Sequence, residues 1–300
     1  MVEKGNILPA LFIENRFIVQ PKTCDGITIR FLTDTGGGCF ITPAAAKKAI
    51  LSISEGNIDG SRGWLAEPPR FKDGDWIPPL MIKGEPAKFP VIDPNQFYLE
   101  KDLDGMLGQA WFANRVWTFD YLTGKMIYHT LWESENNIGG HRVQLGFQKD
   151  SSNYRITNFP RIEATIDGET IDFLFDTGAT LNLSDKGIKE LNKEGSQFVG
   201  TSFITQSIFK KWITRHPNWR VIENAENTTG LPIIEVPEVS IAGLTVGPVW
   251  FTMRPDYNFH KYMSQWMDKQ IDGALGGSAF QFFRITVDYP DGAAYFIRGD

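Results

Sequence analysis

Short runs in which hydrophobic and polar residues alternate dominate the chain, as expected for β-strands with one buried face. The runs around 27–33 and 169–175 have this period of two, and 233–239 and 244–252 are rich in β-branched residues. Patterns with a helical period predict helices over 43–53, 185–193 and 259–269 only. The last of these would carry one apolar stripe, formed by Phe259, Tyr262, Met263 and Trp266. The pattern therefore predicts a mainly β chain with a few short helices.

Turn-forming residues mark where these elements begin and end. Thr42 and Ser184 each precede a predicted helix, where a hydroxyl side chain can cap the first free N–H groups. Between 56 and 96, the pairs Pro68-Pro69 and Pro78-Pro79 and several glycines break any regular pattern. We expect this segment to be a loop-rich excursion from the first half.

An internal repeat organises the whole chain. Residues 25–36 match residues 167–178 at nine of twelve positions, with an offset of 142 residues. A second block, 104–108, matches 272–276 with an offset of 168, so the second half carries 26 extra residues between its blocks. The join falls near 133–141. The chain is thus predicted to be a tandem duplication, with one unit at 1–138 and the other at 139–300.

Composition is consistent with two packed units and excludes several classes of partner. The chain has 300 residues, of which 42% are hydrophobic and 13% aromatic, enough for two ordinary cores. Its net charge of −6 provides no basic field for nucleic acid or for an anionic membrane. The apolar stretch at 7–13 is too short to span a membrane, and no signal peptide precedes it. We expect a soluble protein, cytoplasmic by default and periplasmic or secreted if a signal was trimmed.

The repeated blocks place one aspartate in each half at the end of a predicted strand. Asp34 and Asp176 each begin an Asp-Thr-Gly sequence. Glycine lets two such loops approach closely, and a threonine hydroxyl can bond across to the opposite loop. A pseudo-two-fold axis between the halves would bring the two carboxyl groups face to face. Two close carboxyl groups share one proton and so supply an acid and a base at one point, as the addition of water to an amide requires.

Together these motifs resemble the pepsin-like aspartic proteases and the related retroviral-type proteases. In that family each lobe carries two hydrophobic residues, any residue, and Asp-Thr-Gly, followed later by two hydrophobic residues and glycine. The later motif is matched here by Met106-Leu107-Gly108 and Ala274-Leu275-Gly276. The resemblance implies an all-β, bilobal acid-protease fold with a cleft between the lobes. It also implies an aspartic endopeptidase whose substrate is a peptide or protein and which needs no metal or organic cofactor.

The resemblance assigns roles to individual residues. Asp34 and Asp176 would be catalytic, and the supporting loop residues would be Thr35, Gly36, Thr177 and Gly178. Both aspartates lie in one polypeptide, so a monomer would contain a complete site. The alternative is a catalytically inactive peptide-binding or inhibitor-like protein on the same fold, because site residues and not the fold determine activity.

This chain departs from the family pattern at the edges of the proposed site. Pepsin-like lobes carry serine or threonine after Asp-Thr-Gly, whereas this chain has Gly37 and Ala179. The family's flap tyrosine is also missing, and Trp76 is the aromatic residue nearest its expected place. We therefore predict that 56–96 includes the flap, with Trp76 near its tip or base, and that Gly37, Trp76 and Ala179 contact the substrate. The usual behaviour of tryptophan favours the alternative that Trp76 is a loop anchor against the first unit.

Other catalytic chemistries find little support in the sequence. The four histidines are scattered, and no Gly-x-Ser-x-Gly sequence supplies a serine nucleophile. Two cysteines, Cys24 and Cys39, provide neither a disulfide framework nor a thiolate zinc site. Cys39 is expected to be a small buried side chain and not a nucleophile.

Overall fold

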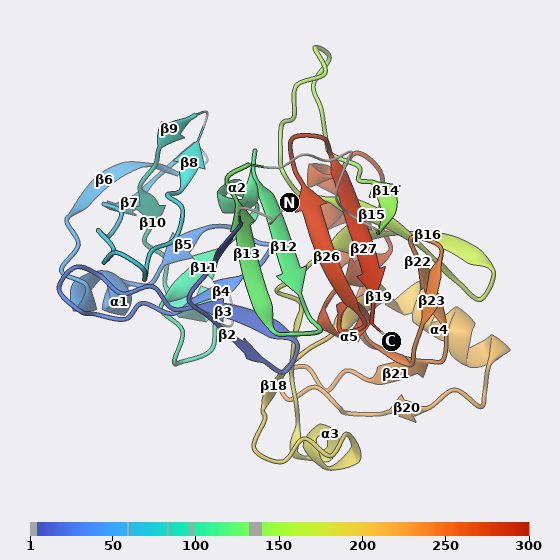
Figure 1. Ribbon diagram of the computed structural model, residues 1–300. Coiled ribbons are helices and arrows are strands. Elements are labelled where there is room, and N and C mark those ends of the chain that lie inside the picture. The colour runs from blue at the N-terminus through green and yellow to red at the C-terminus, as the bar shows by residue number, and fades with distance from the viewer. Residues whose placement is uncertain (1–4, 59, 83, 97–98, 132–139, 300) are drawn as a thin grey trace.

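The computed structural model describes residues 5–58, 60–82, 84–96, 99–131 and 140–299 (Figure 1). The predicted boundary between residues 138 and 139 lies outside these ranges. Within them the chain is mainly β with short helices, which confirms the predicted fold class. No helix in the described ranges is long and apolar enough to cross a membrane.

Each repeated block belongs to a sheet of its own half. The sheet of the first half has the strand order β2 (Ala10–Ile13), β3 (Arg16–Val19), β4 (Phe31–Thr33), β11 (Gly105–Leu107), β5 (Phe40–Ile41). The sheet of the second half has the order β20 (Val221–Ile222), β21 (Ile233–Val236), β24 (Val249–Arg254), β19 (Ser202–Thr205), β25 (Gly273–Leu275), β16 (Glu169–Phe175), β15 (Arg161–Ile166), β22 (Val239–Ile241), β23 (Leu244–Val246). In both sheets the two repeated blocks pair in parallel, β4 with β11 and β16 with β25.

A third sheet joins strands of both halves. Its order is β1 (Gly5–Ile7), β13 (Lys125–His129), β12 (Val116–Asp120), β26 (Phe283–Asp288), β27 (Ala293–Arg298), β14 (His141–Gln144). At its centre β12 pairs antiparallel with β26, and the two strands come from equivalent places in the repeat. This sheet therefore holds the two halves in a fixed relation (Figure 1).

The remaining strands form smaller sheets. A three-stranded sheet has the order β10 (Phe89–Pro90), β7 (Ser61–Ala66), β6 (Ile53–Ile58), and two further pairs are β17 (Thr180–Asn182) with β18 (Phe198–Gly200) and β8 (Met81–Ile82) with β9 (Glu85–Pro86). Five of these short strands lie within or at the edge of 56–96. The segment therefore contains more regular structure than its prolines and glycines predicted.

Helices are short in this protein, and their ends differ from the predictions. They are α1 (Pro43–Lys48), α2 (Gln109–Phe112), α3 (Asp185–Glu190), α4 (Gln206–Arg215) and α5 (Gly277–Phe280), with single turns at Pro94–Gln96, Asn258–Met263 and Ser264–Trp266. Thr42 and Ser184 cap α1 and α3 as predicted, through the N–H groups of Ala45 and Gly187 at 3.1 Å. The helix predicted over 43–53 ends early, because Ile50 is left-handed (φ 55°) and a strand begins at Ile53.

Two other predictions of local structure need correction. The single helix predicted over 259–269 is a π-type turn followed by a 3-10 turn, so its apolar stripe is divided. Phe259 is buried, while Tyr262 and Trp266 are exposed. The helix α4 was not predicted; it packs Phe209 and Trp212 into the core.

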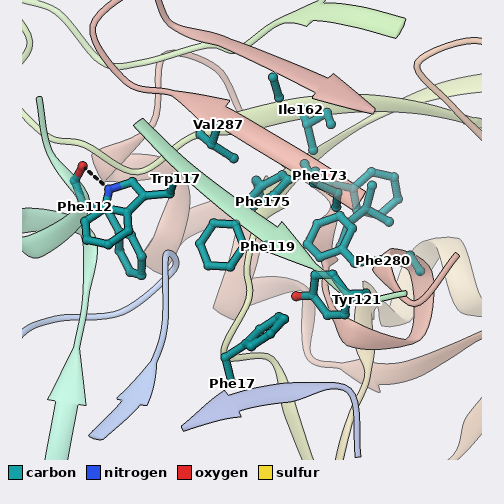
Figure 2. Packing of buried hydrophobic residues seen from close by; sticks show 14 of the residues in the cluster. Phe17, Phe112, Trp117, Phe119, Tyr121, Ile162, Phe173, Phe175, Phe280 and Val287 are labelled. Carbon is teal, nitrogen blue, oxygen red and sulfur yellow. Dashed lines mark hydrogen bonds between the residues drawn. The ribbon is translucent and has the colours of Figure 1, made fainter. Parts of the chain in front are cut away.

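An aromatic core extends from the sheet of the first half through the shared sheet to the sheet of the second half (Figure 2). Phe17 packs on Phe119 with ring centroids 6.0 Å apart, and Phe175 stacks on Phe280 at 4.4 Å. Burying one such ring contributes about 1.5–3 kcal/mol. Because Phe175 immediately precedes Asp176, this core also fixes the base of the second Asp-Thr-Gly loop.

Candidate functional site

Asp34 and Asp176 occupy equivalent positions at the ends of β4 and β16. The N–H of Asp34 donates to Leu107 O at 2.9 Å, and the N–H of Asp176 donates to Leu275 O at 2.8 Å. Each aspartate is therefore held by the second repeated block of its own half. The side chains of Asp34 and Asp176 lie close enough that each affects the ionisation of the other. The structure thus brings together the two aspartates that the repeat singled out.

The threonines of the two motifs connect the loops across the pseudo-two-fold axis. Thr35 Oγ1 donates to Phe175 O at 2.6 Å and accepts from Thr177 N at 3.0 Å. Reciprocally, Thr177 Oγ1 donates to Thr33 O at 3.1 Å and accepts from Thr35 N at 3.2 Å. Both side chains are fully buried. The predicted role of the hydroxyl groups in holding the loops together is therefore present, and each hydroxyl uses both its donor and its acceptor capacity.

The glycines of the motifs are required by the close approach of the two carboxyl groups. A Cβ atom on Gly36 would lie 2.7 Å from Asp176 Cγ, and one on Gly178 would lie 2.3 Å from Asp34 Cγ. Real Cβ atoms do not approach other atoms this closely. A side chain at either position would displace the carboxyl group of the opposite loop.

The pKa values of both aspartates are raised above that of an ordinary aspartate. Burial raises the pKa of Asp34, although the hydrogen bond from Asp176 and the N–H groups of Gly36 and Gly37 partly offset this effect. Burial also raises the pKa of Asp176 well above its usual value, and the charge of Asp34 raises it further. Since each ionised carboxylate disfavours ionisation of the other, the pair retains one proton well above the usual range of a carboxyl group.

Gly37 and Ala179, the residues after the two motifs, also lie directly beside the dyad. A Cβ atom on Gly37 would lie 2.5 Å from Asp34 Oδ2 and 2.8 Å from Met106 Sδ. Glycine at this position therefore has a local steric reason. Ala179 is buried and already has a Cβ, and its N–H helps to lower the pKa of Asp176. Of the two positions, only Ala179 can receive a hydroxyl without displacing Asp34.

This difference selects the variant that tests the effect of the missing hydroxyl groups. We expect Ala179→Ser to move the basic limb of any pH–rate profile to lower pH, by about one unit, because a hydroxyl that donates to Asp176 stabilises its anion and lowers its pKa. Activity of the parent protein should accordingly extend to less acidic pH than in enzymes with serine or threonine after both motifs. Ala179→Gly, which adds no donor, is the control. A basic limb that stays in place or moves upward in Ala179→Ser would contradict this explanation.

Trp76 lies in the segment between β7 and β8, outside the β6–β7 hairpin. Its ring packs edge-to-face on Tyr128 of β13, with centroids 6.2 Å apart. The residues after it contact α2, since Pro78 O accepts from Trp111 Nε1 at 2.7 Å. These contacts are those of a loop anchor, and a role of Trp76 in substrate binding stays a prediction.

Two tyrosines that the sequence did not single out lie in the electric field of the dyad. Tyr121 and Tyr289 occupy equivalent places in the repeat, and their hydroxyl groups are buried without a hydrogen-bond partner among the described residues. Burial raises the pKa of both, and the charges of Asp176 and Asp34, respectively, raise it further. Both phenol groups therefore stay neutral and add no charge near the carboxyl groups. The sequence Asp-Tyr-x-x-Gly occurs at 120–124 and again at 288–292, and this repeat could have indicated both tyrosines.

The cysteines and the metal-ligating side chain types show no further candidate site among the described residues. Cys24 and Cys39 are free thiols. Cys39 Sγ accepts from Gly108 N at 3.1 Å, and burial raises its pKa to about 11, so it is a thiol and not a nucleophilic thiolate. Among the described residues, no group of three or more histidine, cysteine, aspartate and glutamate side chains is arranged to hold a metal ion.

Glu14 and Asn15 form the turn between β2 and β3, and no sequence motif marks them as functional residues. The turn lies against the second half, where Glu14 O accepts from Gly200 N at 2.7 Å. A cavity of about 370 Å³ lies beside it, lined by residues of this turn and by apolar side chains of the second half such as Leu181 and Trp250. Neither aspartate lines this cavity. A polar pair between the apolar runs 10–13 and 16–19 was the only sequence signal for this turn.

Comparison with known proteins leaves the family of this chain open. No family model matches the sequence, and no curated protein matches it. Among solved structures, the chain is similar to the crystal structure of conglutin gamma, a basic 7S globulin from lupine seeds. That comparison has a TM-score of 0.48 and 11% sequence identity, and it covers 100% of this chain and 96% of the other. This similarity assigns neither a family nor an activity to the chain.

Proposed function

We propose that this protein is an aspartic endopeptidase that hydrolyses peptide bonds with a water molecule activated between Asp34 and Asp176. The observation that carries the proposal is the close approach of two carboxyl groups whose pKa values are both raised, each lying against the glycine of the opposite loop. A buried acidic pair of this kind is costly to the fold. Such a pair is suited to chemistry that needs an acid and a base at one point.

The proposed mechanism uses the two carboxyl groups in complementary protonation states. The ionised member accepts a proton from the water as its oxygen attacks the scissile carbonyl carbon. The protonated member donates its proton to the carbonyl oxygen, which forms a tetrahedral gem-diol intermediate. Proton transfer to the amide nitrogen then allows the C–N bond to break, and the dyad returns to its starting state. No step requires a metal or an organic cofactor, and a monomer would supply both carboxyl groups.

The decisive test is cleavage of a denatured protein in acidic and neutral buffers, with and without a statine-type transition-state mimic. We expect cleavage that the mimic blocks. Binding of the mimic without any cleavage would favour the rival function, a non-catalytic peptide-binding or inhibitor-like protein. Cleavage that resists the mimic would remove the dyad from the mechanism.

The β6–β7 hairpin is the part of 56–96 that we propose as the flap. Gly56 and Gly63 face each other across this hairpin, and the side chains of Leu65 and Ile58 fill the space over them, so this face presents an apolar surface. The other face carries the exposed residues Glu55, Arg62 and Trp64.

We therefore expect a transition-state mimic to slow amide hydrogen exchange in β6 and β7 by about tenfold or more, because lids become ordered when they close over a ligand. The β8–β9 hairpin of the same excursion is the internal control, and its exchange should not change. Equal slowing in both hairpins, or none in β6–β7, would argue against this assignment.

A further inference from the structure

The β2–β3 turn of the first half contacts β18 of the second half, where Gly200 N donates to Glu14 O at 2.7 Å. We propose that Glu14 and Asn15 are positioning residues, which hold the Asp176 loop in the geometry that lets its N–H groups reach the carboxyl group. This inference rests on the proposed function and adds to it a contact between the halves that supports one catalytic carboxyl group.

The turn has an unusual backbone conformation. Ile13 pairs with Arg16, so Glu14 and Asn15 are the two central residues of a tight hairpin. Both are left-handed, with φ values of 47° and 60°. Asparagine tolerates this conformation, but glutamate disfavours it. Disfavoured backbone conformations persist where the surrounding contacts determine them.

Those contacts all come from the second half. The carboxylate of Glu14 pairs with Lys193 Nζ at 2.5 Å and accepts from Ser196 Oγ at 3.0 Å. Asn15 Nδ2 donates to Gln281 Oε1 at 3.1 Å. A Cβ atom on Gly277 would lie 2.3 Å from Asn15 O, and one on Gly200 would lie 2.8 Å from it. The turn therefore fits against two glycines and is held by three side chains.

From this contact a short chain of backbone hydrogen bonds leads to the dyad. Gly200, which donates to Glu14 O, pairs with Thr180 in the β17–β18 ladder. The next residue, Thr201, donates its N–H to Ala179 O at 3.0 Å. The N–H groups of Ala179 and Gly178 in turn lower the pKa of Asp176. A displacement of β18 would therefore misalign two donors to a catalytic carboxyl group.

The equivalent contact from the second half to the first is weaker. There, Asn158 N donates to Gln109 Oε1 at 2.8 Å, and Gln109 N donates to Gly37 O at 2.9 Å. This path also ends at the loop of an aspartate, but no ion pair among the described residues reinforces it. The loops of Asp34 and Asp176 are thus held by contacts of different strength. This difference is a structural reason why the two chemically identical carboxyl groups would differ in pKa.

The Glu14 contact should itself depend on pH. Burial alone would raise the pKa of Glu14, but the hydrogen bonds from Lys193 and Ser196 and the charges of Lys193 and Arg16 bring it below its usual value. The ion pair therefore stabilises the fold above the usual range of a carboxyl group, and this contribution is lost as the pH falls through the lowered pKa. Asp34 and Tyr121 are the titratable groups that interact electrostatically with Asp176, and Glu14 is not among them.

The test compares Glu14→Gln and Lys193→Met with Lys211→Met. The control removes an ion pair of similar exposure, between Lys211 of α4 and Glu169 at the start of β16, neither of which contacts the β2–β3 turn through a hydrogen bond or ion pair in the described residues. We expect both test variants to lower kcat by roughly three- to tenfold with little change in KM, and to shift the basic limb of the pH–rate profile upward by about half a unit. The upward shift follows because a carboxyl group with misaligned N–H donors holds its proton more tightly. Lys211→Met should change thermal stability alone.

A second measurement separates this inference from the proposed function. The carboxyl carbon of Asp176 can be titrated by NMR in each variant, whether or not the protein cleaves peptides. If the parent protein proves inactive and Glu14→Gln still raises the pKa of Asp176, the positioning role is supported and the peptidase function is rejected. An unchanged titration and an unchanged basic limb, in variants that lose as much stability as the control, would overturn the positioning role.

Discussion

Asp34→Asn and Asp176→Asn are each expected to abolish the proposed peptidase activity, with a fall in kcat/KM of about 10³-fold or more. An amide keeps the shape of the side chain but can neither accept the proton of the water nor share a proton with the opposite carboxyl group. Because the two carboxyl groups act as one unit, the double variant should be no worse than either single variant. Asp167→Asn is the matched control, since Asp167 lies in an exposed turn and pairs with Arg215 and His216. Near-normal turnover in either single variant would reject the dyad.

The same variants should keep or gain stability. A carboxyl group whose pKa is raised by burial binds its proton more tightly in the folded than in the unfolded chain. Its contribution to the free energy of unfolding is therefore favourable at acidic pH and declines as the pH rises from the usual carboxyl range through the raised pKa. We expect the melting temperature of the parent protein to fall over this interval. In the asparagine variants the fall should be smaller, which calorimetry across the acidic range can measure.

Thr35→Val and Thr177→Val are the substitutions expected to cost the most stability. Each removes a hydroxyl that makes two hydrogen bonds between the loops and leaves a buried N–H and a buried carbonyl without partners. The expected loss is about 2–5 kcal/mol for each variant, which lowers the melting temperature by roughly 5–15 °C in a chain of this size. Peptidase activity should fall as well, since the same bonds hold the carboxyl groups together.

The serine variants at these positions provide the matched control. Thr35→Ser and Thr177→Ser keep the hydroxyl and lose only a methyl group, so they should retain most of the stability and activity. The Thr35→Val, Thr177→Val double variant should lose less than the sum of the single losses, because the two hydroxyl groups bond to the same pair of loops. A valine variant as stable as its serine counterpart would show that these hydrogen bonds do not hold the loops.

Local patterns identified the strands and caps well and the helix ends poorly. The caps at Thr42 and Ser184 depend on neighbouring residues only, and both are present. The end of α1 depends on the left-handed backbone at Ile50, and the divided turn at 258–266 depends on which side chains the second sheet buries. Isoleucine gives no sequence signal for that conformation, and apolar periodicity cannot say which members of a stripe meet a partner.

The repeat by itself determined the two aspartates, the two-part plan and the mainly β class. A duplicated motif indicates that equivalent segments of the two halves fold in the same way and are related by a pseudo-two-fold axis. What only the tertiary structure decided is the environment of those aspartates. Gly37 lies against Met106, Trp76 packs on Tyr128, and the turn at Glu14 accepts a hydrogen bond from Gly200, and each of these contacts joins residues that are far apart in sequence. Such contacts depend on how distant segments pack, within one half or between the two, and neither periodicity nor spacing contains that information.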